Sequence, residues 1–466
     1  MKKTGTAQLL VLVAFLTTAM SGQDSLAKET ILRIHGSNTI GAKLAPDLAK
    51  AFLLKLGAES VKQLDLTSGT EMDIEGHFAD KEQTKVIEIR AHGSSTAFKG
   101  LKEKQCDIGM SSRKIKDSEA QELAGLGDMT GSACEHVLAM DGVAVIVNSS
   151  NAAVSKLSFP QLADIFSGKL KNWSELSWGN APINIQARDE NSGTHDTFKG
   201  IILGEKKLDA AAQRWDSNEK LSDAVNTDVH AVGYCGLPYV KHNKALAISD
   251  GGPAVRPTVF TVATEDYPVS RRLYLYSPAA PANAYTQDFI EFALASDGQE
   301  LVKKHKFVDL TISAEDHKIE VAPGTNQNYQ VLYKYLTGVR EAKRLSANFR
   351  FQGEALALDN RAVRDVERIV DFLASNRNKE ILLAGFSDSA GDSSGDRKMQ
   401  GLPDSQESYE KHLALSCKRA EVVKEELSSR GIKVRELFCV GSEMPVASNS
   451  TALGREKNRR VEVWLK

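Results

Sequence analysis

Residues 28–310 alternate between two patterns of apolar positions. Short apolar runs predict strands at residues 31–34, 86–90, 143–147 and 183–186. Stretches in which apolar residues recur every three to four positions predict helices at residues 41–56, 159–166, 196–203 and 284–304. Strands that alternate with helices indicate an α/β fold with mostly parallel sheets.

The pattern breaks at residues 311–328, a polar stretch that contains Pro323 and Gly324 and is typical of a linker. A connecting helix is predicted at 331–345. A second, smaller α/β unit follows, with helices predicted at 361–376 and 415–427 and strands at 381–384 and 461–465. Its polar segment 392–410, rich in Ser, Gly and Asp, predicts a surface loop. We therefore expect domains at 28–310 and 345–466, joined by 311–344.

The first residues have the organisation of a secretory signal. Lys2 and Lys3 precede an apolar stretch at 9–20, and small residues lead to Ala27, after which cleavage is expected. A transmembrane anchor is the alternative, but the apolar stretch is shorter than the roughly 20 residues that span a bilayer. No later segment is long and apolar enough either. We expect residues 1–27 to be removed and the exported chain to have no transmembrane segment.

Charge argues against one class of partner. The 59 Lys and Arg residues nearly balance the 61 Asp and Glu residues. A formal net charge of −2 gives no broad attraction for nucleic acid. We therefore expect no nucleic-acid binding.

The chain contains five cysteines, an odd number for an oxidising compartment. Cys106 and Cys134 fall in one region and Cys417 and Cys439 in another, so these are the expected pairs, with Cys235 left free. None of them has the Cys-x-x-Cys spacing of a redox motif or a metal site.

Three Gly-, Ser- and Asn-rich loops each lie between a predicted strand and a predicted helix. They are 36–39, 93–96 and 191–194. A helix start exposes backbone N–H groups and the positive end of the helix dipole, and Ser and Thr add donors, which suits an anion. Arg188 and Arg113 also follow predicted strands and would supply positive charge. Ordinary helix capping is the alternative for any single loop, but three loops with two arginines favour a binding site.

Six segments of this unit, in order, resemble the PstS-like phosphate-binding proteins of ABC uptake systems. They are 93–113, 141–151, 159–176, 188–198, 233–240 and 270–276. The resemblance implies a two-lobed periplasmic-binding-protein fold of the class II type, with a hinge that closes on phosphate. The residues that it implies for binding are Ser37, Asn38, Thr39, Ser94, Arg188, Ser192, Gly193 and Thr194.

The sequence departs from that family at one position. Many phosphate binders have an Asp that accepts the proton of hydrogen phosphate and repels sulfate, whereas Ser112 followed by Arg113 stands here. An arginine attracts either anion without discriminating by protonation state. Asp141 is the candidate replacement acceptor; its alternative role is a turn with Gly142. Ser112, Arg113 and Asp141 are therefore included in the predicted site, and its selectivity stays open.

His35, His92 and His195 each adjoin one of the three loops. One interpretation is an anion site that responds to pH or carries a metal, since histidine titrates between about pH 5 and 8. The other is local packing and hydrogen bonding. No helical His spacing supports a metal, so we predict none.

The C-terminal unit resembles the OmpA-like peptidoglycan-associating domain. The segments that carry the resemblance are 381–391, 415–422 and 458–463, with Asn449 before the last. It implies non-covalent binding of the diaminopimelate in peptidoglycan, with Asp388 on its ammonium group and Arg419 on its carboxylate. Asn449 and Arg459 are predicted to contribute. The insert at 392–410 and His412, which stands where the family has Asn, are departures from the pattern.

Together these features predict a periplasmic binding protein for phosphate or a similar oxyanion, held on peptidoglycan in a Gram-negative envelope. An ABC permease is a further expected partner, and neither a cofactor nor catalytic residues are expected. A wall-associated structural or sensor protein is the alternative. A phosphate-ester hydrolase is disfavoured, because residues 28–310 contain no Gly-x-Ser-x-Gly nucleophile motif.

Overall fold

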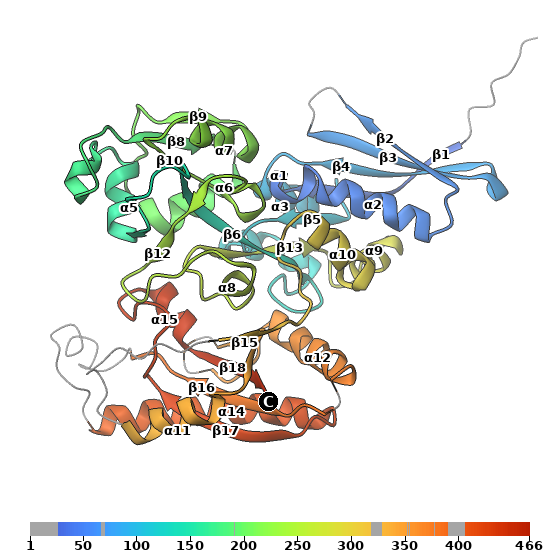
Figure 1. Ribbon diagram of the computed structural model, residues 1–466. Helices are drawn as coiled ribbons and strands as arrows, with labels where there is room; N and C mark the ends of the chain where they lie inside the picture. The colour runs from blue at the N-terminus through green and yellow to red at the C-terminus, as the bar shows by residue number, and fades with distance from the viewer. Residues whose placement is uncertain are drawn as a thin grey trace, which may run out of the picture.

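A computed structural model of the chain describes residues 27–66, 70–190, 192–317, 329–351, 353, 355–376, 378–389 and 406–466. The predicted signal segment lies outside the described residues except for Ala27, the first residue of β1. Figure 1 shows two lobes side by side and a third, C-terminal domain beneath both of them. The predicted α/β class is confirmed.

The first lobe is formed mainly by residues 27–134 and 270–310. Its strands are β1 (Ala27–Gly36), β2 (Ser60–Asp65), β3 (Glu71–Phe78), β4 (Gln83–Arg90), β5 (Ile108–Ser111) and β13 (Ser270–Tyr276). Its helices are α1 (Asn38–Gly41), α2 (Leu44–Lys55), α3 (Ser94–Lys102), α4 (Asp117–Glu122), α9 (Tyr285–Leu294) and α10 (Ser296–Lys304). Every second residue of β3 is buried, and Leu48 and Phe52 of α2 belong to the same apolar cluster as Ile74.

The second lobe is formed mainly by residues 148–263. Its strands are β7 (Lys156–Ser158), β8 (Asn184–Arg188), β9 (Gln213–Trp215), β10 (Ala231–Gly236), β11 (Lys244–Ala245) and β12 (Ala247–Ser249). Its helices are α5 (Phe159–Phe166), α6 (Gly193–Phe198), α7 (Asn218–Thr227) and α8 (Val259–Ala263). Helix α5 has the predicted bounds, and its N-cap Ser158 accepts a hydrogen bond from the Gln161 backbone N–H.

Strand β6 (Glu135–Val147) belongs to both lobes. All 13 of its residues are buried. Its first part pairs with β13, from Glu135 to Gly142, and its last part pairs with β10, from Val143 to Val147. The resulting sheet has the order β2-β3-β4-β1-β5-β13-β6-β10-β8-β9. The lobes are therefore joined through β6 and through the return of the chain into β13.

The C-terminal domain is a sheet covered by helices on both faces. Its elements are β14 (Ala314–Asp316), α11 (Tyr329–Val339), β15 (Lys343–Arg350), α12 (Asn360–Ala374), β16 (Ile381–Phe386), α14 (Gln406–Ser429), β17 (Val434–Gly441), α15 (Ala452–Asn458) and β18 (Arg460–Leu465). The strand order is β14-β15-β18-β16-β17. Helices α12 and α14 share one apolar cluster, and α11 belongs to another on Trp464.

Several predicted boundaries differ from those of the structure, and those around the start of the C-terminal domain and its polar loop differ most. The helix predicted at 331–345 ends at Val339, because residues from Lys343 onward pair in the sheet as β15. Residues 314–316 of the predicted linker form β14, which pairs with β15. Residues 406–410 of the predicted surface loop are the start of α14; the rest of that loop, before residue 406, lies outside the described residues.

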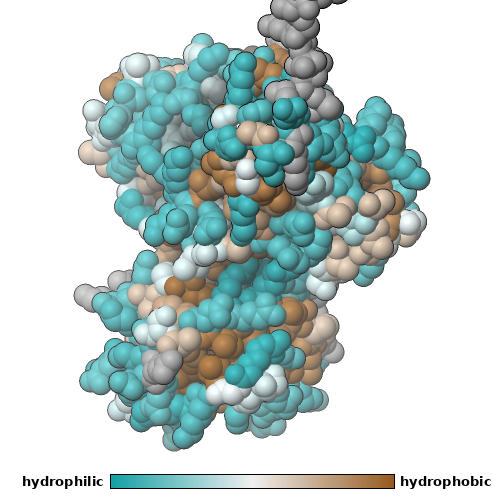
Figure 2. Space-filling view, turned by 90° about the vertical axis from the view of Figure 1, so that its right-hand side faces the viewer, coloured by the Kyte–Doolittle hydropathy of each residue, from teal (hydrophilic) through white to brown (hydrophobic). Residues whose placement is uncertain are grey.

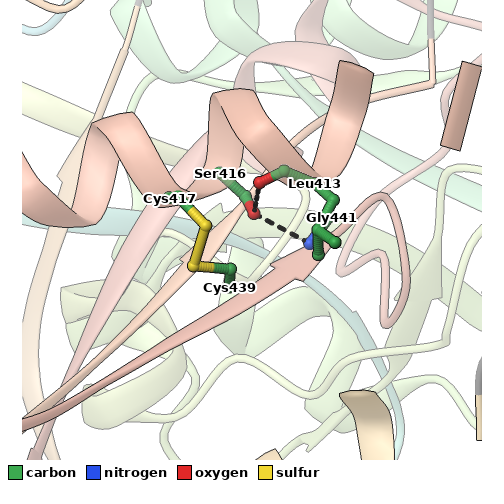
Figure 3. Close-up of a disulfide and its surroundings, with 5 residues drawn as sticks. All are labelled: Leu413, Ser416, Cys417, Cys439 and Gly441. Atoms are coloured by element: carbon green, nitrogen blue, oxygen red, sulfur yellow. Dashed lines mark hydrogen bonds between the residues drawn. A yellow bond between two sulfur atoms is a disulfide. The ribbon is translucent and has the colours of Figure 1, made fainter. Parts of the chain in front are cut away.

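One of the two predicted cysteine pairs forms a disulfide. Cys417 of α14 and Cys439 of β17 are joined, next to a Ser416 hydroxyl that accepts a hydrogen bond from the Gly441 backbone N–H (Figure 3). The predicted Cys106–Cys134 pair is wrong, because both thiols are free and buried. Burial raises the pKa of the Cys106 thiol to about 12, so it acts as an apolar core group. Cys235 is free, as predicted.

The C-terminal domain docks on the lobes through buried charges. The Asp266 carboxylate accepts hydrogen bonds from Arg344 at 2.8 Å and from Arg350 at 3.3 Å. Burial alone would raise the pKa of Asp266, but the positive charges of these arginines outweigh it and lower the pKa to about 2. Removing one partner from such a buried pair costs about 3–5 kcal/mol. A substitution that removes either partner would therefore leave an uncompensated buried charge in the docked protein.

Outside this contact the surface is largely polar. Figure 2 shows hydrophilic side chains over most of one face of the molecule, with hydrophobic ones gathered mainly over the C-terminal domain. Val363 of α12 is among the large apolar residues that remain exposed, at 40%. Across the described ranges, we found no helix with both the length and the apolar character that crossing a bilayer requires.

The cysteine arrangement predicts a thiol count. Protein that is unfolded without reductant should react with alkylating reagent at three thiols, those of Cys106, Cys134 and Cys235. Peptide mass mapping should recover Cys417 joined to Cys439. Replacing both of these with Ser should lower the free energy of unfolding of the C-terminal domain by about 3 kcal/mol, because the bridge closes a loop of about 20 residues. Recovery of a Cys106–Cys134 peptide would contradict this arrangement.

The burial of His136 predicts that the folded protein loses stability in acid. It is 2% exposed in β6, and burial, with a further contribution from Arg364, lowers its pKa to about 4. In the unfolded chain this histidine has a pKa near 6.5, so it is protonated at a higher pH than His136 in the folded protein. Protonation therefore favours the unfolded state, and the free energy of unfolding falls as the pH drops from about 6.5 to 4. The loss should reach about 3 kcal/mol at pH 4.

Chemical unfolding of the His136→Gln variant at several pH values measures this effect. The fall in stability between pH 7 and pH 4 should be smaller by about 3 kcal/mol than in the parent protein. The same substitution at the exposed His242 serves as the control for loss of an imidazole. An unchanged pH dependence in His136→Gln would show that this group does not titrate as its burial requires.

Candidate functional site

The first predicted loop follows β1 and lies against the end of β5. Ser37 is buried, its backbone N–H donates to the Met110 carbonyl at 2.9 Å, and its hydroxyl accepts from the Thr39 backbone N–H at 3.2 Å. The Asn38 side-chain oxygen is buried without a hydrogen-bond partner among the described residues. The loop therefore retains unused hydrogen-bonding capacity at Asn38.

The second and third predicted loops meet across the two lobes. Ser94, at the start of α3, accepts from the Ser112 backbone N–H at 3.0 Å, and the two hydroxyl oxygens are 3.2 Å apart. Gly193 approaches from the second lobe so closely that a Cβ atom there would lie 2.5 Å from the Ser112 hydroxyl oxygen. Only glycine permits this approach. The backbone at Gly193, about 100 positions further along the chain, thus packs against the paired hydroxyl groups of Ser94 and Ser112.

Arg188 and the loop after it enter the same region from β8. Arg188 is 5% exposed, and its guanidinium donates to the carbonyls of Trp215 at 3.1 Å and Asp216 at 2.9 Å. Burial is the main cause that lowers the pKa of Arg188, and the positive charge of Arg271 lowers it further. Ser192 is the N-cap of α6 and accepts from the His195 backbone N–H. Asn191 lies outside the described residues.

Arg271 of β13 is a site residue that the sequence analysis missed. Its guanidinium donates twice to one oxygen of Asp141, at 3.0 and 2.7 Å, and also to the Gly193 carbonyl at 2.8 Å and the Thr194 hydroxyl at 3.1 Å. It therefore ties the third loop to the strands that join the lobes. The segment 270–276 was noticed for its resemblance, but the partner Asp141 is 130 positions away and nothing local indicates the pair.

Arg271 also fixes the surroundings of Asp141. That carboxylate is completely buried and accepts a third hydrogen bond from the Leu237 backbone N–H at 3.3 Å. The alternative role of Asp141 as a turn residue does not describe the structure, because it lies inside β6. Arg113, in contrast, turns to Glu119, with contacts of 2.7 and 2.6 Å, and stacks on Phe98.

The three histidines next to the loops have separate surroundings. His195 is buried and its Nδ1 lies 2.6 Å from the Tyr234 hydroxyl. His92 lies 2.7 Å from Glu71, in a polar groove on the first lobe that His35 also lines. Burial is the main cause that lowers the pKa of both His35 and His195. Among the described residues, no three His, Cys, Asp or Glu side chains are grouped so as to hold a metal ion.

The chemistry of this cluster suits a small oxyanion. Two buried guanidinium groups, Arg188 and Arg271, lie near each other, and Asp141 neutralises one of them. Hydroxyl groups and the start of α6 surround them. Positive charge and hydrogen-bond donors held by protein contacts bind an anion without further ordering of the side chains.

The predicted residues of the C-terminal domain converge at the end of β16. Asp388 is 8% exposed and accepts from Arg459 at 2.9 Å, while Arg459 also donates to the Phe351 carbonyl at 3.0 Å. The Asn449 side-chain oxygen accepts from the Ser389 backbone N–H at 3.3 Å. A carboxylate, a guanidinium group and an amide are thus held together there.

Arg419 of α14 is completely buried beside this group. It donates to the carbonyls of Phe386 at 3.1 Å and Gly353 at 2.6 Å, and it lies over the ring of Phe351. His412, on the same helix, is buried with its Nδ1 3.5 Å from the Ser387 hydroxyl. In this arrangement Arg459, rather than Arg419, makes the ion pair with Asp388.

Two family models match the chain. The model of the PBP superfamily domain matches residues 64–297, and the model of the OmpA family matches residues 349–459. The matches fall on the two-lobed part and on the C-terminal domain, respectively, which agrees with the two resemblances seen in the sequence.

Curated relatives match the first part. The phosphate-binding protein PstS of Staphylococcus epidermidis is 29% identical over 229 residues, which cover 47% of this chain and 69% of the relative. The phosphate-binding protein PstS of Staphylococcus aureus is 31% identical over 216 residues, which cover 44% of this chain and 64% of the relative.

Solved structures match the same part. An ABC-type phosphate transport receptor from Vibrio cholerae is 23% identical with a TM-score of 0.47, covering 59% of this chain and 99% of that one. A putative phosphate ABC transporter substrate-binding protein from Clostridium perfringens, with bound phosphate, is 29% identical with a TM-score of 0.45, covering 60% of this chain and 98% of that one. Since the first family model alone matches half of its length, the chain belongs to the PBP superfamily, and it ends in an OmpA family domain.

Proposed function

We propose that this protein binds phosphate, or an oxyanion of similar shape, between the lobes and is held on peptidoglycan by its C-terminal domain. The observation that carries the first half is the meeting of Ser94, Ser112 and Gly193 across the lobes, next to Arg188 and Arg271. The relatives that match this part are named as phosphate-binding proteins. A periplasmic location follows from this function and from the predicted signal segment.

Within this proposal the ligand lies among the three loops. Hydroxyl, amide and backbone groups of these loops supply the donors, and they belong to Ser37, Asn38, Thr39, Ser94, Ser112, Ser192, Gly193 and Thr194. Arg188 supplies charge, and Arg271 holds the third loop in place through the Gly193 carbonyl. Arg113, which is paired with Glu119, acts at the margin of the site. Asp141 sets the net charge of the site through Arg271.

The C-terminal half of the proposal depends on Asp388 and Arg459. Diaminopimelate in the wall peptide carries both an ammonium group and a carboxylate, and a carboxylate–guanidinium pair is complementary to both. Asn449 holds the Asp388 segment through Ser389, and Arg419 holds the neighbouring backbone. Delivery of the anion to an ABC permease is a further part of the proposal.

A second candidate function is that of a wall-bound sensor or store. The observation that favours it is the firm docking of the C-terminal domain on both lobes, since a wall-bound receptor cannot diffuse freely to a permease. Uptake of labelled phosphate by cells that lack the gene distinguishes the two: unchanged uptake supports the sensor or store, and reduced uptake supports the transport role.

Arg188→Ala tests the anion site. Loss of its guanidinium should weaken phosphate binding about 100-fold, because hydrogen bonds from charged groups contribute up to about 3 kcal/mol. Calorimetric titration of protein freed of bound ligand by partial unfolding measures the affinity. The matched control is Arg33→Ala, an arginine of the first lobe that pairs with Asp107 and is not among the proposed anion-binding residues. Failure of the parent protein to bind phosphate or sulfate would contradict the proposal, and equal affinity for both would make it a general oxyanion binder.

Asp388→Asn tests the wall site. The substitution keeps the shape but removes the negative charge, so the fraction of protein that sediments with purified sacculi should fall about tenfold, as expected from the loss of about 1.4 kcal/mol or more of charge-assisted binding. Glu380→Gln in the same domain, at the exposed pair with Arg435, is the control. Unchanged sedimentation of Asp388→Asn would show that peptidoglycan binds elsewhere on the protein or does not bind to it.

A further inference from the structure

The C-terminal domain contacts the loop that leads from the second lobe into β13. Glu265 and Asp266 in this loop lie within 3.6 Å of Arg344, Arg350 and Arg361 of the C-terminal domain. All three arginines are at most 5% exposed. These are buried charges that neutralise one another, so the two surfaces are specific for this one arrangement.

Further contacts extend this docking surface beyond the loop. The ammonium group of Lys457 donates to the Tyr267 carbonyl at 2.6 Å. The backbone N–H of Ser448 donates to both oxygens of Asp250 at 3.0 Å. Asp250 follows β12, so these contacts reach well into the second lobe.

The same domain also contacts the first lobe. The Asn360 side-chain amide, at the start of α12, donates to the Thr130 carbonyl at 2.8 Å and to Glu135 at 3.2 Å. Glu135 is the residue of β6 that pairs with Tyr276 of β13, within the sheet of the first lobe. Figure 1 shows α12 and α15 of the C-terminal domain beneath the two lobes. The domain thus spans the strands about which the lobes would rotate.

Adjacent residues of β13 connect this docking surface with the anion site. Arg272 pairs with Glu265 at 2.6 Å and with Asp359 of the C-terminal domain at 2.8 Å. Arg271 pairs with Asp141 and holds the Gly193 carbonyl. Successive side chains of a strand point to opposite faces, so one short strand carries both sets of contacts.

The lobes are held closed in this arrangement. Gly193 of the second lobe lies against Ser112 of the first, at a separation that leaves no room for a Cβ atom. The contacts at Asn360 and Asp250 join the C-terminal domain to both lobes in this same state. Rotation of the lobes apart would have to break at least one of them.

We propose that the C-terminal domain is a clamp that holds the two lobes closed and so raises the affinity of the site between them. The proposal rests on the anion-binding half of the proposed function and extends it. If the site is formed in only a fraction of the molecules, the apparent affinity for the ligand is the intrinsic affinity multiplied by that fraction. Because linkage is reciprocal, an anion between the lobes also strengthens the docking of the C-terminal domain.

Two full-length variants test the clamp. Asn360→Ala combined with Asp250→Ala removes one contact to each lobe, and Asp266→Lys places a like charge among Arg344 and Arg350. Neither variant changes a residue of the proposed anion site. Arg435→Ala, at an exposed ion pair of the C-terminal domain, is the matched control. Hydrogen exchange of residues 264–272 and 343–350 reports whether docking is lost, and circular dichroism reports whether each variant folds.

The expected result is faster exchange in both segments and phosphate binding weakened at least about fivefold, with Arg435→Ala unchanged. X-ray scattering without phosphate should show a larger radius of gyration in the variants, which phosphate reverses. Faster exchange with phosphate affinity within about twofold of the parent would overturn the proposal. If hydrogen exchange of these segments stays slow in both variants, the proposal is also contradicted, because the substituted contacts would then not be needed to keep the C-terminal domain docked. If the parent protein binds no oxyanion, the result would instead contradict the proposed function itself.

Discussion

Charges that are buried must be neutralised where they lie, and this constraint acts with most force beside the strands that join the lobes. Arg271 and Arg272 are neighbours in β13, and each is held by a carboxylate of the two-lobed part. Asp141, 130 positions away, neutralises Arg271, and Glu265 pairs with Arg272. Arg272 also reaches Asp359 of the C-terminal domain, so it links β13 to that domain.

The same constraint explains why the C-terminal domain is fixed in position. A domain joined by a polar segment has many orientations available to it. Here Arg350 would lose its carboxylate partners Glu265 and Asp266 if the domain separated. Arg344 would lose Asp266 and keep Glu462 of its own domain. The anion site that we propose would gain from this arrangement, because its loops come from both lobes and meet where Gly193 lies against Ser112.

Local sequence predicted the parts of the fold whose causes are local. Helix α5 has the predicted bounds because Ser158 and Gln161 cap it and its apolar residues lie on one face. Ser94, Ser192 and Gly193 could be predicted as binding residues because loops at strand ends have a recognisable composition, and their role in binding stays a prediction. Helix 331–345 was predicted too long, since the pairing of β15 with distant β18 overrides helical periodicity after Val339. The Cys106–Cys134 pair failed for a similar reason: closeness in sequence says nothing of where two thiols point in a core.

The sequence by itself determined the α/β class, the succession of two units, the three loops and the residues at the end of β16, because each depends on periodicity or on motifs within a few residues. Only the tertiary structure decided that Arg271 pairs with Asp141 beside the third loop, that Arg113 turns to Glu119, and that Arg459 is the partner of Asp388. It also decided how the C-terminal domain sits on the lobes. The pairs of Arg271 and Arg459 join charges that lie far apart in the chain, and electrostatic attraction selects a partner by its position in space, which no local pattern records.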